Sequence, residues 1–204
     1  MKRILFCILC IMCFTGAMHA QRMGVMAGMS FSETTLRFGD FSYHGLKSKA
    51  GFNGGVIMEF PLSKAAAVNT GLLYTQRGYR MNDSFDDMEH NIKASMITQN
   101  LEIPVNMNLR LRLPVIQPFI QAGPYLMVAL SGRMKEGKVS EDIDFTGPDK
   151  DMKRVDFGFN MGAGADILNF RILFNYGLGF VNLRVPDDYK MRNRAFTASV
   201  AYMF

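Results

Sequence analysis

The sequence is poor in cysteine and contains no tryptophan. Its three cysteines, Cys7, Cys10 and Cys13, all lie among the first 20 residues. Because that segment has the features of a signal peptide, which is removed on export, we expect the mature chain to contain no cysteine. Disulfide bonds, thiolate metal sites and cysteine nucleophiles are then excluded from the folded protein.

Residues 1–20 have the order of a secretory signal peptide. Lys2 and Arg3 precede an apolar run over 4–14, and small residues follow up to Ala20. The run is too short to cross a bilayer comfortably as a helix. We expect cleavage after Ala20, with Ala17 as the alternative, which leaves residues 21–204 as one outer-membrane β-barrel domain. No cysteine follows a small residue here, which disfavours a lipid anchor.

The rest of the chain lacks both a long apolar run and a basic run. The formal net charge of +5 falls to +3 when Lys2 and Arg3 leave, and no cluster of cations suited to nucleic acid remains. No segment after residue 20 approaches the ~20 apolar residues of a membrane helix. A chain like this can cross a membrane only as a closed sheet, because every backbone polar group must find a partner in lipid.

Apolar and polar residues alternate along eight segments of the mature chain, which is typical of β-strands with two different faces. The predicted strands cover 22–32, 51–60, 66–80, 95–112, 117–131, 154–166, 170–181 and 194–204. Short connections alternate with long ones over 33–50, 81–94, 132–153 and 182–193. This pattern predicts an all-β fold, an eight-stranded antiparallel up-and-down transmembrane β-barrel with short periplasmic turns.

A soluble barrel or sandwich also alternates and is the competing interpretation. The predicted apolar face carries bulky side chains such as Leu101, Phe157 and Phe174, whereas the other face is rich in Gly, Asn and Ser. Small polar residues suit the narrow interior of an eight-stranded barrel, so the bulky face should meet lipid. The lysines avoid the strand interiors. The last strand also ends in alternating residues that resemble an outer-membrane assembly signal: Phe196, Val200, Tyr202 and Phe204.

Several segments, in order, resemble one known family. They are GFNGGVIMEFPL (51–62), LLYTQRGY (72–79), LEIPVNMNLRL (101–111), PFIQAGPYLM (118–127), DFGFNMGAGADI (156–167), FRILFNYGLGFVNL (170–183) and RNRAFTASVAYMF (192–204). The series is similar to the PorT-like outer-membrane β-barrel family of Bacteroidota. The resemblance implies the fold and a location in a Gram-negative outer membrane. One branch of that family serves protein secretion and gliding, and nothing in these segments singles out that branch.

Charged residues on the polar faces are the candidate site. Charges inside a barrel need partners or water, and we expect an interior ionic network of Arg22, Glu59, Arg77, Glu102, Arg110, Arg112, Asp156, Asp166 and Arg171. Arg22 and Glu59, and likewise Asp166 and Arg171, should be neighbours across hairpins. The preferred interpretation is a packed plug, and the alternative is a narrow path for small ions.

The only histidines after residue 20 are His44 and His90, both in predicted long loops with serines nearby. They allow a weaker alternative, a lipid-modifying enzyme of the outer rim.

Pro104 and Pro124 interrupt strands, which predicts a bulge or a lost ladder bond at each. Aromatic residues near strand ends, including Tyr79 and Phe170, suit the membrane interfaces.

We therefore expect an integral outer-membrane protein that is not an enzyme and has no cofactor and no metal. Its predicted role is a membrane scaffold, a surface interaction module or an accessory of an envelope or secretion machine. A narrow pore and the rim enzyme are the alternatives. The expected partners are outer-membrane lipid, the barrel-assembly machinery during biogenesis and an unidentified envelope protein, but not nucleic acid.

Overall fold

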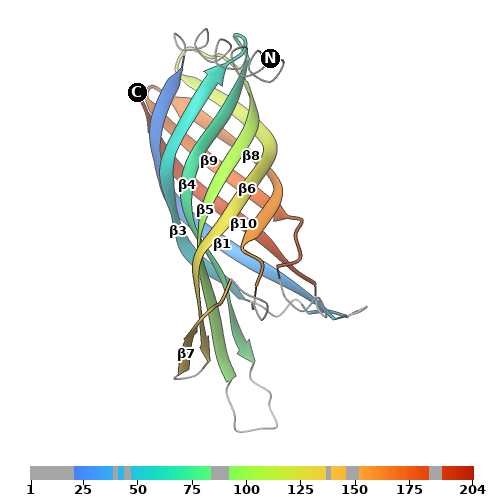
Figure 1. Ribbon diagram of the computed structural model, residues 1–204. Helices are drawn as coiled ribbons and strands as arrows, with labels where there is room; N and C mark the ends of the chain where they lie inside the picture. The colour runs from blue at the N-terminus through green and yellow to red at the C-terminus, as the bar shows by residue number, and fades with distance from the viewer. Residues whose placement is uncertain are drawn as a thin grey trace, which may run out of the picture.

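A ring of antiparallel strands closes on itself in the computed structural model of the chain (Figure 1). The structure describes residues 21–38, 41–43, 47–83, 92–136, 139–145, 152–183 and 190–204. The signal peptide predicted at 1–20 lies outside these residues. Eight long strands form the ring: β1 (Arg22–Phe38), β3 (Lys47–Pro61), β4 (Ala66–Asp83), β5 (Ile92–Arg110), β6 (Ile116–Glu136), β8 (Val155–Ile167), β9 (Phe170–Gly179) and β10 (Lys190–Met203).

Each long strand pairs with its neighbours in the order β10-β9-β8-β6-β5-β4-β3-β1. The pairing of β1 with β10, from Gly24 opposite Met203 to Arg37 opposite Lys190, closes the ring. Two short strands lie outside it: β2 (Phe41–Tyr43) pairs with β1, and β7 (Val139–Asp142) pairs with β6. The predicted eight-stranded antiparallel barrel is confirmed. Within the described residues no helix is long and apolar enough to cross a membrane.

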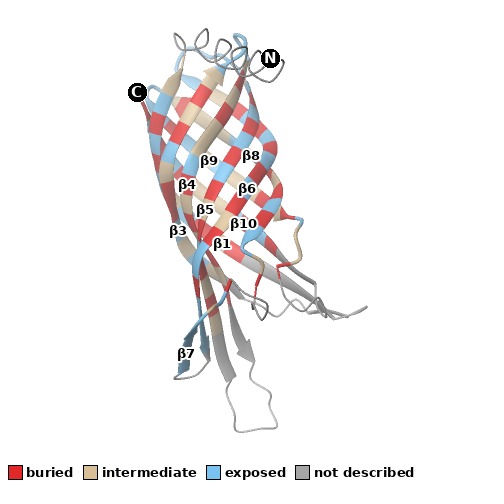
Figure 2. Cartoon of the chain, in the orientation of Figure 1, coloured by how far each residue is buried: buried red, intermediate tan, exposed pale blue. Residues whose placement is uncertain are grey.

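Alternate residues of the wall face opposite sides, as the banding of buried and exposed residues in Figure 2 shows. Phe157 and Phe174 point outward and are 49% and 50% exposed, whereas Glu102 and Asn160 point inward and are buried. The outer face is therefore the apolar one. This orientation confirms the interpretation as a membrane barrel and is the reverse of a soluble one.

Most of the strands are longer than the sequence pattern predicts, although β9 ends two residues early, at Gly179. β5 and β6 contain 19 and 21 residues, although roughly 9–11 tilted residues cross the apolar part of a membrane. Their extra residues pair beyond the barrel wall, and β6 continues into a hairpin with β7 (Figure 1). The predicted loops 33–50, 81–94, 132–153 and 182–193 are thus partly strand. Both faces of such an extension are wet, so the alternation that marks a strand disappears from its sequence.

The prolines break the ladder without shifting its register. Between β4 and β5, pairing stops after Thr70–Val105 and resumes at Leu73–Glu102, so the gap falls at Pro104. Between β5 and β6, pairing stops after Pro104–Tyr125 and resumes at Met107–Ala122 in the same register, so this gap includes Pro124. Of the two predicted outcomes, the structure has the lost ladder pairing, because proline has no N–H to donate. The register shift between these strands lies elsewhere, at Gln99–Asn100.

Candidate functional site

One end of the barrel, where the chain makes its short turns at 62–65, 111–115 and 168–169, is here called the short-turn end; the other is the long-hairpin end. An ionic cluster closes the interior near the short-turn end. Inward positions of five strands supply its members: Arg22 on β1, Glu59 on β3, Arg110 on β5, Asp166 on β8 and Arg171 on β9. The sheet register places Arg22 opposite Glu59 and Asp166 opposite Arg171, the two hairpin pairs that the sequence predicts.

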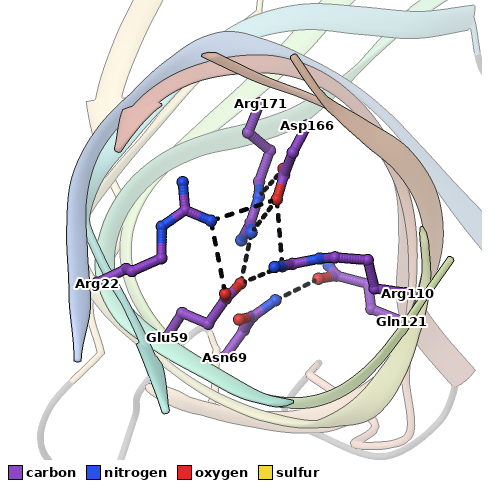
Figure 3. Close-up of polar contacts among 7 residues, drawn as sticks. All are labelled: Arg22, Glu59, Asn69, Arg110, Gln121, Asp166 and Arg171. Atoms are coloured by element: carbon purple, nitrogen blue, oxygen red, sulfur yellow. Dashed lines mark hydrogen bonds and ion pairs between the residues drawn. The ribbon is translucent and has the colours of Figure 1, made fainter. Parts of the chain in front are cut away.

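Two carboxylates bind three guanidinium groups in this cluster (Figure 3). Arg110 Nη2 lies 2.6 Å from Glu59 Oε2 and 3.1 Å from Asp166 Oδ2. Arg171 donates from Nε to Asp166 Oδ1 at 2.7 Å and from Nη2 to Glu59. Arg22 is more exposed and lies 3.8 Å from Glu59 and 3.7 Å from Asp166. The cluster therefore crosses the interior and joins strands on opposite walls.

The members of the cluster do not balance in charge. Glu59, Asp166 and Arg171 are buried, and Arg110 is nearly so, with 10% of its side chain exposed. Three positive and two negative groups leave one positive charge in excess. Buried ions that satisfy one another are expensive to separate, since each would lose its partners without regaining water. The cluster thus places a small excess of positive charge in the interior near the short-turn end.

A second buried ion pair lies farther along the axis. Arg77 Nη2 donates to Glu102 Oε2 at 2.6 Å, and Asn160 donates to the other carboxylate oxygen at 3.0 Å. The Arg77 guanidinium also lies over the ring of Tyr125, 5.3 Å from its centroid. Asp156 is buried nearby in the wall and accepts a hydrogen bond from Asn193 at 3.3 Å. With Arg77 beside the two carboxylates of Glu102 and Asp156, this layer has no excess of positive charge, unlike the ionic cluster.

A small cavity of about 60 Å³, lined by both polar and apolar side chains, separates these two layers. Its lining includes Asn53, Asn69 and Asn160, which donate from Nδ2 to Ser199, Gln121 and Glu102. The nitrogens of these three amides are engaged, whereas their carbonyl oxygens have no protein partner. A cavity of this size and polarity suits a few ordered water molecules rather than a passing solute.

Apolar side chains cap the interior at the long-hairpin end. The cap consists of Tyr79, Met96, Ala129, Phe145, Met152 and Leu183, all buried, with Ile143 and Val181 packed against them. Phe145 and Met152 come from the connection between β7 and β8, within the long connection predicted at 132–153. Folding back over the mouth removes their apolar surface from water. The interior is therefore interrupted at three levels along its axis.

The structure separates the predicted network into two groups and excludes one member. Arg112 is wrong as an interior residue: it follows the last residue of β5, lies in the turn at the short-turn end and is exposed. Tyr79 is also not at the lipid interface, because its register position faces inward, into the cap.

His44 and His90 lie outside the described residues. In the described part of the chain, no three His, Cys, Asp or Glu side chains are grouped so that they could hold a metal ion.

Sequence reasoning missed the large inward aromatic residues. Phe119 and Tyr125 are buried inside the barrel, and Arg171 lies over the Phe119 ring at 4.9 Å. Each stands opposite a glycine of β8, Gly164 and Gly158, where an added Cβ would lie 2.6 and 2.5 Å from ring atoms. A glycine facing inward beside a bulky inward residue was the available signal. Small residues on β8 thus make the room that the rings occupy.

Residues 17–183 match the family described as outer membrane protein beta-barrel domain. Three solved barrels are similar over nearly their whole length. The outer membrane enzyme PagL is 12% identical, with 88% of this chain and 98% of that chain covered and a TM-score of 0.50. Neisserial surface protein A is 11% identical, with 89% and 97% covered and a TM-score of 0.47.

The attachment invasion locus protein Ail of Yersinia pestis, solved in complex with the heparin analogue sucrose octasulfate, is 15% identical, with 90% and 99% covered and a TM-score of 0.46. No curated protein sequence matches the chain. At these identities the likeness to solved structures concerns the fold alone. The family match spans more than half of the chain and extends into β9 and the residues that follow it.

Proposed function

Because the chain belongs to the outer membrane protein beta-barrel domain family, we propose that it acts in the outer membrane as a closed, non-catalytic scaffold. This scaffold would hold a β-sheet platform at the cell surface. One observation carries this proposal: the interior is interrupted by the ionic cluster, the Arg77–Glu102 pair and the apolar cap, in series. A barrel with a filled interior has no continuous aqueous path. Its useful surfaces are then its two ends and its lipid face.

The orientation follows from the usual arrangement of such barrels, in which short turns face the periplasm and long connections face outward. We therefore place the short-turn end, with the ionic cluster, in the periplasm. The long-hairpin end carries the apolar cap and the paired extensions of β4, β5 and β6. Outward-facing residues of the wall between the two ends contact lipid.

The extensions supply a platform for recognition. β4 and β5 remain paired as far as Asp83 and Ile92, and β6 pairs with β7 from Arg133–Asp142 to Glu136–Val139. A paired sheet holds its side chains more rigidly than a free loop, and binding residues are often displayed on loops of a rigid scaffold. An envelope protein or surface glycan is the class of partner that such a platform suits.

Conductance tests the closed interior. The purified protein, inserted into a planar lipid bilayer, should give no open-channel steps, since the three layers leave no continuous water column. A porin in the same membrane provides the control for detection, and protease protection verifies insertion. Regular ohmic steps from the wild-type chain would favour the narrow-pore alternative and contradict the closed scaffold.

Trimming the hairpin tests the platform. Arg133 and Asp142 are register partners, so an Asn-Gly turn joining them directly in place of 134–141 closes a two-residue hairpin. We expect the trimmed barrel to insert normally but to lose the envelope partner that is crosslinked to the intact chain. Arg133→Gln, which keeps the hairpin, is the matched control. Identical crosslinks from trimmed and intact chains would contradict the platform.

Three finer assignments belong to the same proposal. The resemblance in the segments quoted above supports membership of the PorT-like family, and the order of residues 1–20 supports a cleaved signal peptide. The final strand supports recognition by the barrel-assembly machinery, since Phe196, Val200, Tyr202 and Phe204 all lie exposed on the outer face. A chain truncated before Phe204 should assemble more slowly than the full chain.

The rim-enzyme alternative depends on His44 and His90. A strain that carries His44→Ala and His90→Ala should have the same lipid profile as the wild type if the protein is not catalytic. A changed profile in the double variant, with the barrel still present in the membrane, would overturn the non-catalytic assignment.

A further inference from the structure

A recess of about 270 Å³ opens at the short-turn end, and the ionic cluster forms part of its floor. Glu59 and Asn108 are buried at the bottom, whereas Lys64 and Arg112 are exposed at the rim. No aromatic side chain is among the described residues that line it. The recess therefore does not suit a nucleobase or a sugar ring, which would need a flat apolar surface to stack on.

Positive charge predominates around this recess. Arg22, Lys64, Arg110 and Arg112 line it, and Glu59 is the one carboxylate among the described residues that do so. Glu59 already binds the three arginines of the cluster. The cluster itself carries one excess positive charge, and Lys64 and Arg112 add two more. Neither of these rim cations forms an ion pair with another residue in the described ranges.

The floor contains buried polar atoms without a protein partner. Asn108 is 0% exposed, and neither its amide nitrogen nor its amide oxygen has a hydrogen-bond partner. Arg110 Nε, also buried, has none either, although the other end of the same guanidinium binds Glu59 and Asp166. Buried polar groups are rarely left unpaired. Two unused donors beside an excess of positive charge indicate a place for an acceptor with negative charge.

We propose that this recess binds a small, doubly charged oxyanion of the phosphate class from the periplasmic side. Its oxygens would accept from the accessible part of the Arg110 guanidinium. Asn108 would turn its buried amide toward the recess to donate to the anion, and a protonated phosphate oxygen would donate to the Asn108 carbonyl. Lys64 and Arg112 would contribute at the rim. Charge-assisted hydrogen bonds of this kind are stronger than neutral ones. The site is independent of the closed-scaffold proposal, because the anion enters from one end and does not have to cross the barrel.

Titration calorimetry of the detergent-solubilised full barrel tests this site. Inorganic phosphate is the probe, and sodium chloride at matched ionic strength is the reference. We expect saturable phosphate binding near one site per chain and no such signal from chloride. Arg112→Gln and Lys64→Gln should each weaken binding about fivefold, as expected for loss of one nearby charge at a solvated rim. Both residues are exposed and lie outside the ionic cluster, so the fold should persist.

Two further variants sharpen the result. Asn108→Asp keeps the side-chain size but places a negative charge on the floor, and should weaken phosphate binding at least tenfold. Arg133→Gln removes an exposed cation at the opposite end and should leave binding unchanged. Absence of saturable binding by the wild type, or equal weakening by Arg112→Gln and Arg133→Gln, would overturn the proposal. It does not depend on the conductance experiment.

The source of the phosphate group is resolved by a second ligand. Glycerol 3-phosphate is small enough for the recess and carries the same charged group. Tighter binding of glycerol 3-phosphate than of inorganic phosphate would support the site and assign it to a phosphomonoester. Equal or weaker binding would support the site and assign it to free phosphate.

Discussion

Glu59 shows how a single inward residue connects distant parts of the wall. It lies on β3 and binds guanidinium groups from β1, β5 and β9. The neighbouring Asp166 shares all three. Each carboxylate is therefore held by several cations rather than by one. Loss of one carboxylate would leave three buried or half-buried guanidinium groups around the other.

We expect Glu59→Gln to destabilise the barrel by roughly 3–5 kcal/mol, the range for breaking a buried ion pair from one side. Urea unfolding in lipid vesicles, followed by the shift in gel mobility of the folded barrel, measures the change. Asp142→Asn is the matched control, because its pair with Arg133 is solvent-exposed and exposed pairs contribute little. Equal unfolding midpoints for Glu59→Gln and the wild type would show that the ionic cluster does not stabilise the barrel.

At the scale of the element, the turn between β8 and β9 is under strain. Leu168 has a φ of 54° and is the described non-glycine residue with positive φ. Ile167 and Phe170 are register partners, so two residues make the whole turn. Two-residue turns of this hand favour asparagine or glycine, because a Cβ crowds the carbonyl in the left-handed region. The leucine side chain is almost fully exposed and gains no packing within the chain in return.

Leu168→Asn should stabilise the barrel by about 1 kcal/mol, since asparagine tolerates the left-handed conformation better than leucine. The measurement is again the urea midpoint in vesicles. Leu168→Ala separates backbone strain from loss of the exposed side chain: alanine keeps the Cβ and should show no comparable gain. A larger gain for alanine than for asparagine would contradict strain as the cause.

At the scale of the whole molecule, the bulky apolar face is outside and the polar face inside, so the medium around the protein must be apolar. Phe157 on β8 is half exposed on the outer wall, whereas Phe119 on β6 is buried in the interior. The two residues are chemically identical and differ only in the face that their register gives them. The natural absence of tryptophan makes a single introduced indole an unambiguous reporter.

Phe157→Trp should fluoresce at short wavelength and be strongly quenched by brominated lipids, because its indole would lie in the acyl chains. Phe119→Trp should be quenched far less, since the wall would shield it from lipid. The comparison requires both variants to show the gel mobility of the folded barrel. Stronger quenching of the Phe119 variant would mean that the two faces are reversed.

Local alternation is sufficient to predict eight strands and the face of most of their residues, because the side-chain period of a strand is two regardless of what it pairs with. The same parity placed Glu59, Asp166 and Arg171 inside and predicted the two hairpin pairs. Parity cannot say how far a strand continues beyond the membrane, where both faces meet water. For that reason the sequence predicts loops where the structure has the extensions of β5 and β6 and the hairpin with β7.

The sequence by itself determined that the chain is a closed sheet with an apolar outside, since eight alternating segments without a long apolar run allow little else. Only the tertiary structure decided which charges meet. Arg110 joins Glu59 and Asp166 across the interior, whereas Arg112, with the same parity, falls beyond the end of its strand and belongs to the recess. Such contacts depend on the stagger of the strands around the ring, a property that no single segment encodes.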